Sequence, residues 1–206
     1  MIERGILFSA PMVRALLAGT KSVTRRLLKP RHDYFVEDGV PFFEPYVYAV
    51  PESVPVPCPY GEAGDRLFVK ETWATVQSLD GVRPINLANY VPLHYCADHA
   101  ERGKFRENRG RVRPSIFMPR WASRITLDVV SVRCERLHEI TEEEAKREGV
   151  EPRITTTKVY PSRHAADVEH RSYRGGFEDL WGVINGAESW ATNPYVWRVE
   201  FKRVIP

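Results

Sequence analysis

Cysteine is scarce in this chain of 206 residues. The three cysteines, Cys58, Cys96 and Cys134, are odd in number and far apart, which argues against a disulfide framework and for reduced thiols. A zinc site formed by Cys58, His94, Cys96 and His99 is conceivable, but it lacks the paired C-x-x-C spacing of structural zinc sites. We therefore expect plain cysteines and no metal.

Long hydrophobic runs are missing as well. No apolar stretch reaches the roughly 20 residues that span a bilayer, and the N-terminus lacks the charged and then apolar pattern of a secretory signal. We expect a cytoplasmic protein without a membrane partner. A nucleophile elbow, a Walker loop, an H-E-x-x-H motif and a dinucleotide fingerprint are also absent. This removes the common hydrolase, kinase and dehydrogenase classes, and we expect no cofactor.

The hydrophobic content of 43% over 206 residues is sufficient for a sizeable core. The simplest arrangement is one domain over residues 1–206, with insertions at about 31–60, 74–113 and 151–174. The first insertion is rich in proline, which removes backbone donors and forbids long helices or central strands. At most it holds a short hairpin. The second is irregular with one short strand near residues 91–96, and the third is polar and mobile.

Positive charge is concentrated in one segment. Residues 102–124 carry eight basic side chains against one acidic residue, Glu107, and so have a net charge of +7, whereas the whole chain has +3. Phe105, Phe117 and Trp121 are interleaved with the basic residues, so the segment offers both phosphate neutralisation and stacking surfaces. A solvated basic loop is the alternative. The contact residues predicted for a nucleic acid are Arg111, Arg113, Arg120 and Trp121.

A compact polar cluster follows the first predicted helix, in the stretch SAPMVRALLAGTKSVTRR. Ser9 can cap this helix, apolar residues recur in it at helical spacing, and Gly19 ends it. Lys21, Thr24 and Arg26 come directly after this end. If the segment is extended, Thr24 and Arg26 share one face. A solvated basic turn would have the same composition, so spacing alone does not assign a function.

The remaining elements follow from periodicity and capping signals. Residues 66–73 alternate as a half-buried strand, with Glu71 near its end. In the strand over residues 124–137, the apolar phase switches to Val130, Val132 and Cys134, which indicates a bulge. Thr141 and Glu144 form a capping box for a helix over 142–148. The last elements are a helix that packs through Phe177, Leu180, Trp181 and Ile184, and a strand over 195–201.

The pattern Gly19-x-Lys21-x-x-Thr24-x-Arg26 resembles the signature G-x-K-x-x-[E/T]-x-R of ASCH domains, small β-barrels related to PUA RNA-binding domains. Three further stretches, GDRLFVKETW, ITEEEAKREGV and NPYVWRVEF, follow in the order expected for this family. The whole chain looks like the longer ASCH proteins of bacteriophages and prophages, and similarity to short members covers only these stretches. The resemblance implies an α+β fold, a PUA-like (ASCH) β-barrel with short flanking helices and loop insertions.

The resemblance also implies a chemistry. The short ASCH members include a bacterial 4-N-acetylcytidine amidohydrolase whose lysine, threonine and glutamate are catalytic, and Lys21, Thr24 and Glu148 match these three. In that match, Lys21 is the proton acceptor, Thr24 the nucleophile and Glu148 the proton donor. From physical chemistry alone, Glu148 could instead orient Lys21, and water could be the nucleophile. The residues predicted to support the site or bind substrate are Arg25, Arg26 and Glu71.

Two functions therefore remain open from the sequence. One is a metal-independent amidohydrolase that acts on acylated cytidine or a related modified nucleoside. The other is an RNA- or nucleic-acid-binding module in which Lys21 and Arg26 hold phosphate, with single-stranded RNA cleavage as a variant. The predicted partners are accordingly a modified nucleoside or RNA.

Overall fold

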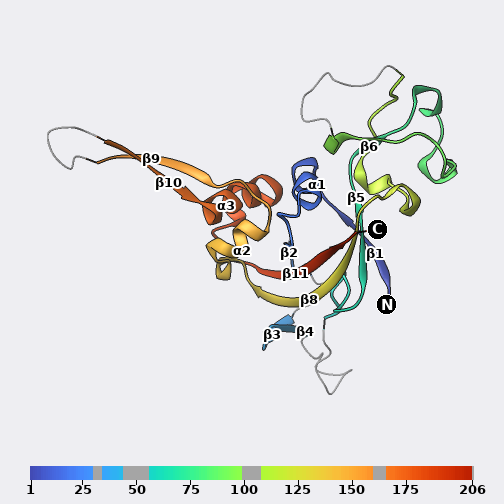
Figure 1. Cartoon of the computed structure of the whole chain (residues 1–206). Helices are drawn as coiled ribbons and strands as arrows, with labels where there is room; N and C mark the ends of the chain where they lie inside the picture. Colours follow the sequence, from blue (N-terminus) through green and yellow to red (C-terminus); the bar gives the residue numbers. More distant parts are fainter. Residues whose placement is uncertain (30–33, 44–55, 99–107, 160–165, 206) are drawn as a thin grey trace. The chain divides into compact units, whose positions relative to one another are not determined.

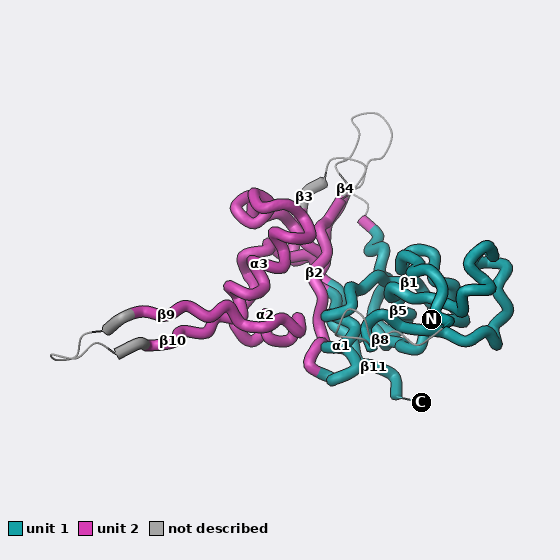
Figure 2. Tube along the Cα trace, turned by 90° about the horizontal axis from the view of Figure 1, so that it is seen from above, with its two compact units in different colours: residues 1–19, 57–132, 199–206 teal, residues 20–56, 133–198 magenta. Residues whose placement is uncertain are grey.

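The computed structural model describes residues 1–29, 34–43, 56–98, 108–159 and 166–205 (Figure 1). The chain divides into two compact units, each assembled from separate stretches (Figure 2). Unit 1 comprises residues 1–19, 57–132 and 199–206, and unit 2 comprises residues 20–56 and 133–198. A single ASCH domain over the whole chain stays a prediction.

The structure contains short helices and many strands, connected in places by single 3-10 turns. In chain order the elements are β1 (Glu3–Leu7), α1 (Ala10–Leu17), β2 (Val23–Leu27), β3 (Tyr34–Glu37), β4 (Val40–Phe43), β5 (Arg66–Lys70), β6 (Trp73–Ala74), β7 (His94–Tyr95), β8 (Thr126–Arg136), α2 (Glu142–Arg147), β9 (Arg153–Val159), β10 (Ala166–Ser172), α3 (Tyr173–Asn185) and β11 (Tyr195–Val204).

The largest sheet has the strand order β1-β5-β8-β11-β2. Strand β1 runs parallel to β5, with Ile6 opposite Val69, and β5 runs antiparallel to β8, with Leu67 opposite Leu127. In the described residues β1 and β2 are the outer strands of this sheet and do not pair with each other. The predicted α+β class is confirmed, but the predicted closed barrel is not seen, because closure requires a ladder between the outer strands.

The core of unit 1 follows the predicted periodicity. Leu67 and Val69 on β5 are buried, as expected for a strand with one apolar face. Helix α1 buries Val13 and Leu16 and begins after Ser9, although the Ser9 side chain makes no capping hydrogen bond. The chain leaves this helix through Gly19, whose φ of +74° is the left-handed conformation that glycine adopts without strain.

Strand β8 shows the predicted change of phase only in part. Leu127 and Val129 are buried and Cys134 follows at an even position, as predicted, but the odd-numbered Glu135 is buried as well. Val130, however, is exposed over 41% of its surface, so the switch occurs later along the strand than predicted.

The core of unit 2 centres on α3. Phe177 and Trp181 are 3% exposed and pack with Leu137, Ile140 and Val196. The predicted apolar face is confirmed over these two aromatic residues, with Leu180 half-buried beside them. Ile184, by contrast, is 60% exposed, so the packed face ends one turn before the helix does.

Of the three predicted insertions, the third contains more regular structure than expected, whereas the first holds the short hairpin and the second the short strand that were predicted. Residues 153–172 are not an irregular loop, because β9 and β10 form an antiparallel hairpin with Thr157 opposite Val168. The proline-rich insertion begins with the β3–β4 hairpin, which turns through Asp38 and Gly39 at positive φ. The second insertion holds β6 and β7, and the predicted strand there is only two residues long. Residues 44–55 and 99–107 lie outside the described part of the chain.

No helix in the described residues is both long and apolar enough to cross a membrane.

Candidate functional site

Helix α2 carries the predicted glutamate. The Thr141 hydroxyl accepts a hydrogen bond from the Glu144 backbone N–H at 3.2 Å, which is one half of the predicted capping box. The Glu144 carboxylate, which would form the other half, instead accepts hydrogen bonds from Arg25 and Arg198. Gly149, at a φ of +75°, follows the last turn. Glu148 is therefore the C-terminal capping residue of α2, at the negative end of the helix dipole.

The segment after Gly19 docks on this helix end. The Ser22 N–H donates to the Arg147 carbonyl at 2.9 Å. Lys21 Nζ donates to the Glu148 carbonyl at 2.7 Å, to Glu148 Oε2 at 2.8 Å and to the Val23 carbonyl at 2.8 Å. The two side chains are only 1% and 3% exposed. The structure thus brings Lys21 and Glu148 together across 127 positions of sequence, and the lysine charge offsets the unfavourable position of the carboxylate.

Arg25 ties this pair to two further carboxylates. Its Nη2 lies 2.6 Å from Glu135 Oε1 and 2.6 Å from Glu144 Oε2, and its Nη1 lies 3.4 Å from Glu148 Oε1. Arg198 Nε also donates to Glu144, at 2.9 Å. We call the six residues Lys21, Arg25, Glu135, Glu144, Glu148 and Arg198 the acid–base cluster; all of them belong to unit 2.

The acid–base cluster balances three cations against three carboxylates. Five of its six residues are at most 5% exposed, and the Glu144 side chain is 16% exposed. Breaking one pair in so dry an environment leaves an uncompensated charge, which destabilises a protein by about 3–5 kcal/mol. The cluster is therefore a rigid network in which each charge depends on its neighbours.

Burial perturbs two of the titratable groups. Burial lowers the pKa of Lys21 below its ordinary value; the Glu148 carboxylate opposes this shift, and the Arg26 and Arg25 charges add to it. For Glu144, burial works against the ionised form, but the Arg25 and Arg198 charges outweigh it and lower the pKa. Compared with water, the cluster therefore shifts Lys21 toward its uncharged form and Glu144 toward its ionised form.

Thr24 is placed less favourably for its predicted role. It lies on β2 and is 3% exposed. Because side chains alternate along a strand, Thr24 and Arg26 share one face and Arg25 lies on the other. Among the described residues, no hydrogen bond joins the Thr24 hydroxyl to Lys21 or Glu148. The nucleophile role of Thr24 stays a prediction.

Glu71 does not project into an open cleft. It is 1% exposed, and Arg124 contacts both of its carboxylate oxygens, at 2.9 and 3.1 Å. Arg124 also pairs with Asp98 at 2.7 Å and stacks 4.0 Å from the centre of the Tyr95 ring. Burial raises the pKa of Glu71, and Arg124 opposes this shift. All of these residues belong to unit 1, and a substrate-binding role for Glu71 stays a prediction.

Several side chains of the basic segment, residues 102–124, are paired or buried within unit 1. Arg120 forms a two-bond ion pair with Glu3 at 2.6 and 2.7 Å, and Arg113 is 3% exposed. Trp121 is half-buried beside the core cluster around Trp73. Of the four predicted contact residues, Arg111 and Arg120 are exposed, and Arg120 is the one paired with Glu3. Arg102, Lys104 and Arg106 lie outside the described residues.

Three members of the acid–base cluster were not singled out from the sequence as site residues: Glu135, Glu144 and Arg198. A signal was present for two of them, because Glu135 follows the buried Cys134 and Arg198 lies between Trp197 and Val199 in an apolar strand. A charged residue within an apolar strand needs a buried partner. For Glu144 the sequence indicates only a place in the capping box.

In the part of the chain that the structure describes, no group of three or more His, Cys, Asp or Glu side chains is arranged to hold a metal ion. Cys58, Cys96 and Cys134 form no disulfide, and burial raises the pKa of Cys58 to about 11. His99, the fourth member of the conceivable zinc set, lies outside the described residues.

Comparison of the chain with protein-family models, with curated proteins and with solved structures gave no match. The ASCH resemblance accordingly stays a prediction from the motifs.

Proposed function

We propose that the acid–base cluster, in a PUA-like (ASCH) protein, is the catalytic centre of a metal-independent amidohydrolase that acts on acylated cytidine or a related modified nucleoside. The observation that supports this is the 2.8 Å contact between Lys21 Nζ and Glu148 Oε2, with both side chains almost completely removed from water. The substrate class rests on the motif resemblance alone.

The Lys21–Glu148 pair can provide both a general acid and a general base, because its two side chains share one proton. When the ammonium proton moves along the 2.8 Å hydrogen bond, Lys21 becomes a neutral amine and Glu148 a carboxylic acid. Burial favours the neutral amine of Lys21, because desolvation disfavours its charged form. The pair is then a general base and a general acid side by side.

The proposed reaction proceeds through an acyl-enzyme. Neutral Lys21 takes the Thr24 hydroxyl proton as Oγ attacks the carbonyl carbon, and Glu148 donates its proton to the departing N4 of cytidine. Water then cleaves the Thr24 ester, which gives the free acid and restores the hydroxyl. Thr24 must approach Lys21 for this reaction, and catalytic hydrogen bonds often tighten only when substrate is bound.

The proposal is tested by incubating the purified protein with 4-N-acetylcytidine and a panel of other acylated nucleosides, while absorbance and released acid are followed. We expect equimolar cytidine and acetate. A folded protein that releases neither product from any member of the panel contradicts the proposal. Glu143→Gln, an exposed change on α2 outside the cluster, is the matched control and should retain activity.

The alternative at the same residues is a phosphate-binding site for RNA, with or without RNA cleavage. Lys21 already donates three hydrogen bonds to protein oxygens and its side chain is 1% exposed. A phosphate would have to displace these acceptors, so the geometry favours proton transfer over phosphate binding. A single-stranded RNA oligonucleotide tests this alternative: a nuclease shortens it, and a phosphate-binding site at these residues binds it more weakly in Lys21→Ala than in the wild type.

A further inference from the structure

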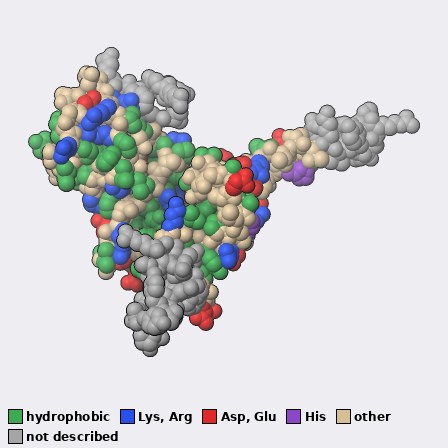
Figure 3. All heavy atoms as spheres, turned by 180° about the vertical axis from the view of Figure 1, so that it is seen from behind, with side chains coloured by type: hydrophobic (Ala, Val, Ile, Leu, Met, Phe, Trp, Pro, Cys, Tyr) green, Lys and Arg blue, Asp and Glu red, His purple; other side chains and the backbone are tan. Residues whose placement is uncertain are grey.

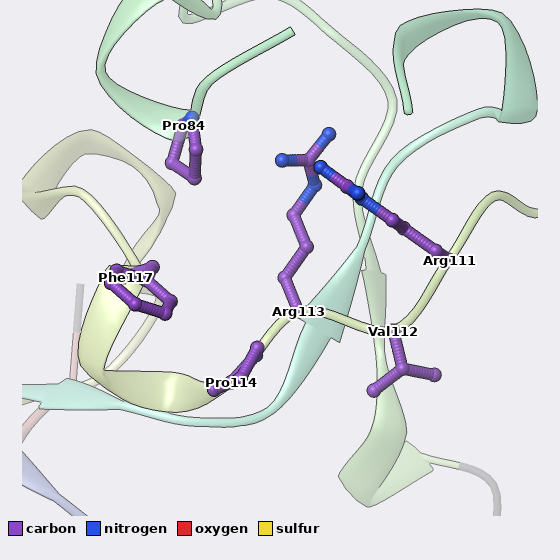
Figure 4. A pocket seen from close by; sticks show the side chains of 6 residues that line it. All are labelled: Pro84, Arg111, Val112, Arg113, Pro114 and Phe117. Carbon is purple, nitrogen blue, oxygen red and sulfur yellow. The ribbon is translucent and has the colours of Figure 1, made fainter. Parts of the chain in front are cut away.

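Unit 1 contains a pocket that the proposed amidohydrolase does not use. It has a volume of about 330 Å³ and is lined by Pro84, Arg111, Val112, Arg113, Pro114 and Phe117 (Figure 4). Two short turns, Pro84–Asn86 and Ser115–Phe117, contribute to its wall. Its volume lies at the lower end of the range of small-molecule sites, about 300–1,000 Å³.

Arg113 places a buried charge at this pocket. Its Nη1 donates to the Val82 carbonyl at 3.0 Å and its Nη2 to the Leu79 carbonyl at 2.8 Å, while its Nε is buried without an acceptor. Carbonyl groups carry no net charge, and no carboxylate in the described residues forms an ion pair with Arg113. A buried guanidinium with unused N–H groups and no anionic partner is uncommon, since buried charges are normally paired.

Arg111 adds a second positive charge beside the first. Figure 4 shows the end of its side chain next to the Arg113 guanidinium. Burial and the Arg111 charge lower the pKa of Arg113, and Asp80 opposes this shift. Asp80 also accepts a hydrogen bond from the Arg111 backbone N–H at 2.8 Å. Two guanidinium groups against one carboxylate leave a local excess of one positive charge, which a bound anion would neutralise.

The other walls of the pocket are apolar. Figure 4 shows the rings of Pro84 and Phe117 across from the arginines. Phe117 is 60% exposed and Val112 46% exposed, so flat apolar surface is presented to solvent beside the positive charges. Figure 3 shows the same mixture of basic and hydrophobic side chains on the lobe around β6, at the upper left. Such a combination of aromatic and cationic groups suits a ligand that carries a planar ring and an anion.

We propose that this pocket binds a nucleotide, with its phosphate at Arg111 and Arg113 and its base against Phe117 and the proline rings. The nucleotide is either a free mononucleotide or one unit of a single-stranded nucleic acid, since both present the same chemistry. The proposal concerns residues of unit 1 only and is independent of amide hydrolysis at the acid–base cluster.

The test is calorimetric titration of the full chain with uridine 5′-monophosphate, uridine, and a single-stranded oligouridylate of about ten nucleotides, which matches common site sizes. Arg111→Gln and Phe117→Ala remove the exposed charge and the exposed ring. Their matched controls are Lys202→Gln, an exposed cation elsewhere in unit 1, and Ile116→Ala, which is 59% exposed next to Phe117 but does not line the pocket. Thermal unfolding checks that every variant is folded.

We expect the monophosphate to bind at least about tenfold more tightly than uridine, because a phosphate forms charge-assisted hydrogen bonds with guanidinium groups. Arg111→Gln and Phe117→Ala should each weaken binding by about five- to tenfold, in line with the loss of one phosphate contact or one stacked base. Tighter binding of the oligouridylate than of the monophosphate, with the same two variants impaired, identifies a single strand as the source. Weaker binding of the oligouridylate identifies the free nucleotide.

The proposal is overturned if neither phosphate-bearing probe binds the folded protein, or if Arg111→Gln and Phe117→Ala both bind like the wild type. It is also overturned if Lys202→Gln weakens binding as much as Arg111→Gln does, since the attraction would then come from overall charge and not from the pocket.

Discussion

The proposed chemistry depends on Lys21. Its hydrogen bonds are those of a charged ammonium group. Three oxygens surround Nζ, which suits the three hydrogens of an ammonium. A base must have a free lone pair, so the reaction begins only when one proton has moved to Glu148. The lowered pKa of Lys21 makes this transfer easier than it would be in water.

The pH dependence of hydrolysis should report this shared proton. At alkaline pH the pair loses its proton, and with it the general acid; because the pKa of Lys21 is lowered, the rate should fall at a pH below the ordinary lysine value of about 10.4. At acid pH a second proton blocks the base, so kcat/KM should pass through a maximum. A rate that keeps rising beyond pH 10 would show that Glu148 only orients Lys21.

Thr24 provides a separate test of the nucleophile. Thr24→Val keeps the shape of the buried side chain and removes the hydroxyl, and it should lower the rate of amide hydrolysis by about 100-fold or more while the protein stays folded. Thr24→Ser should keep measurable activity. An undiminished rate in Thr24→Val would assign the attack to water and leave the Lys21–Glu148 pair as the catalytic groups. Acetate release under single-turnover conditions is the measurement.

At the level of residues, the sequence was informative where a motif fixed the spacing. Lys21 and Glu148 could be paired through the ASCH resemblance, and the structure places them in contact. The partners of Arg25 could not be named, because Glu135 and Glu144 lie more than a hundred positions away and only the fold brings them to it.

Among the elements, α2 is the most important for the site, because Glu144 lies within it and Glu148 is its C-terminal capping residue. A helix of six residues has little stability of its own. Thr141→Ala removes the hydroxyl that caps it and should lower the free energy of unfolding by about 1 kcal/mol, together with hydrolysis.

Ser9→Ala is the matched control for Thr141→Ala. Ser9 occupies the same capping position on α1, but its side chain makes no capping hydrogen bond, so its loss should change the stability by only a few tenths of a kcal/mol. Chemical denaturation of both variants compares them directly. Equal losses would show that the Thr141 hydrogen bond contributes nothing specific to α2.

Glu144 connects α2 to two buried arginines and should make the protein sensitive to acid. Its pKa is lowered in the folded protein, so the stability it contributes is complete above its unfolded value of about 4.3 and is lost as the pH falls through the folded value. Glu144→Gln should therefore lower the free energy of unfolding by about 2–4 kcal/mol at neutral pH and by much less near pH 2. Glu143→Gln should have little effect at either pH; a pH-independent loss in Glu144→Gln would contradict the charge argument.

The elements that could be predicted are those with local signals. Helices α1 and α2 have caps and terminal glycines, and both lie within about a residue of their predicted bounds. The β9–β10 hairpin was missed because neither face is buried where its side chains are described, and Ile154 and Val168 are 55% and 38% exposed. A strand without a buried face has no hydrophobic alternation for the sequence to show.

For the molecule as a whole, the order of the strands in the main sheet cannot be predicted from the sequence. Each strand of the main sheet had its own signal, but the pairing of β1 with β5 joins segments about sixty positions apart, and alternation within one strand does not name its neighbour. The open order β1-β5-β8-β11-β2 therefore replaces the expected closed barrel. A count of charges along the basic segment also does not show that Arg120 is paired with Glu3 and that Arg113 is buried; nucleic-acid contacts at these residues stay a prediction.

The most direct test of the central claim is hydrolysis of 4-N-acetylcytidine by Lys21→Arg compared with the wild type. A guanidinium keeps the positive charge but does not release its proton, so we predict that hydrolysis falls by about 100-fold or more. Lys146→Arg, an exposed change in the same α2 region, should retain activity, and circular dichroism should show that both variants are folded. Wild-type rates of acetate release in a folded Lys21→Arg protein would contradict proton transfer by Lys21.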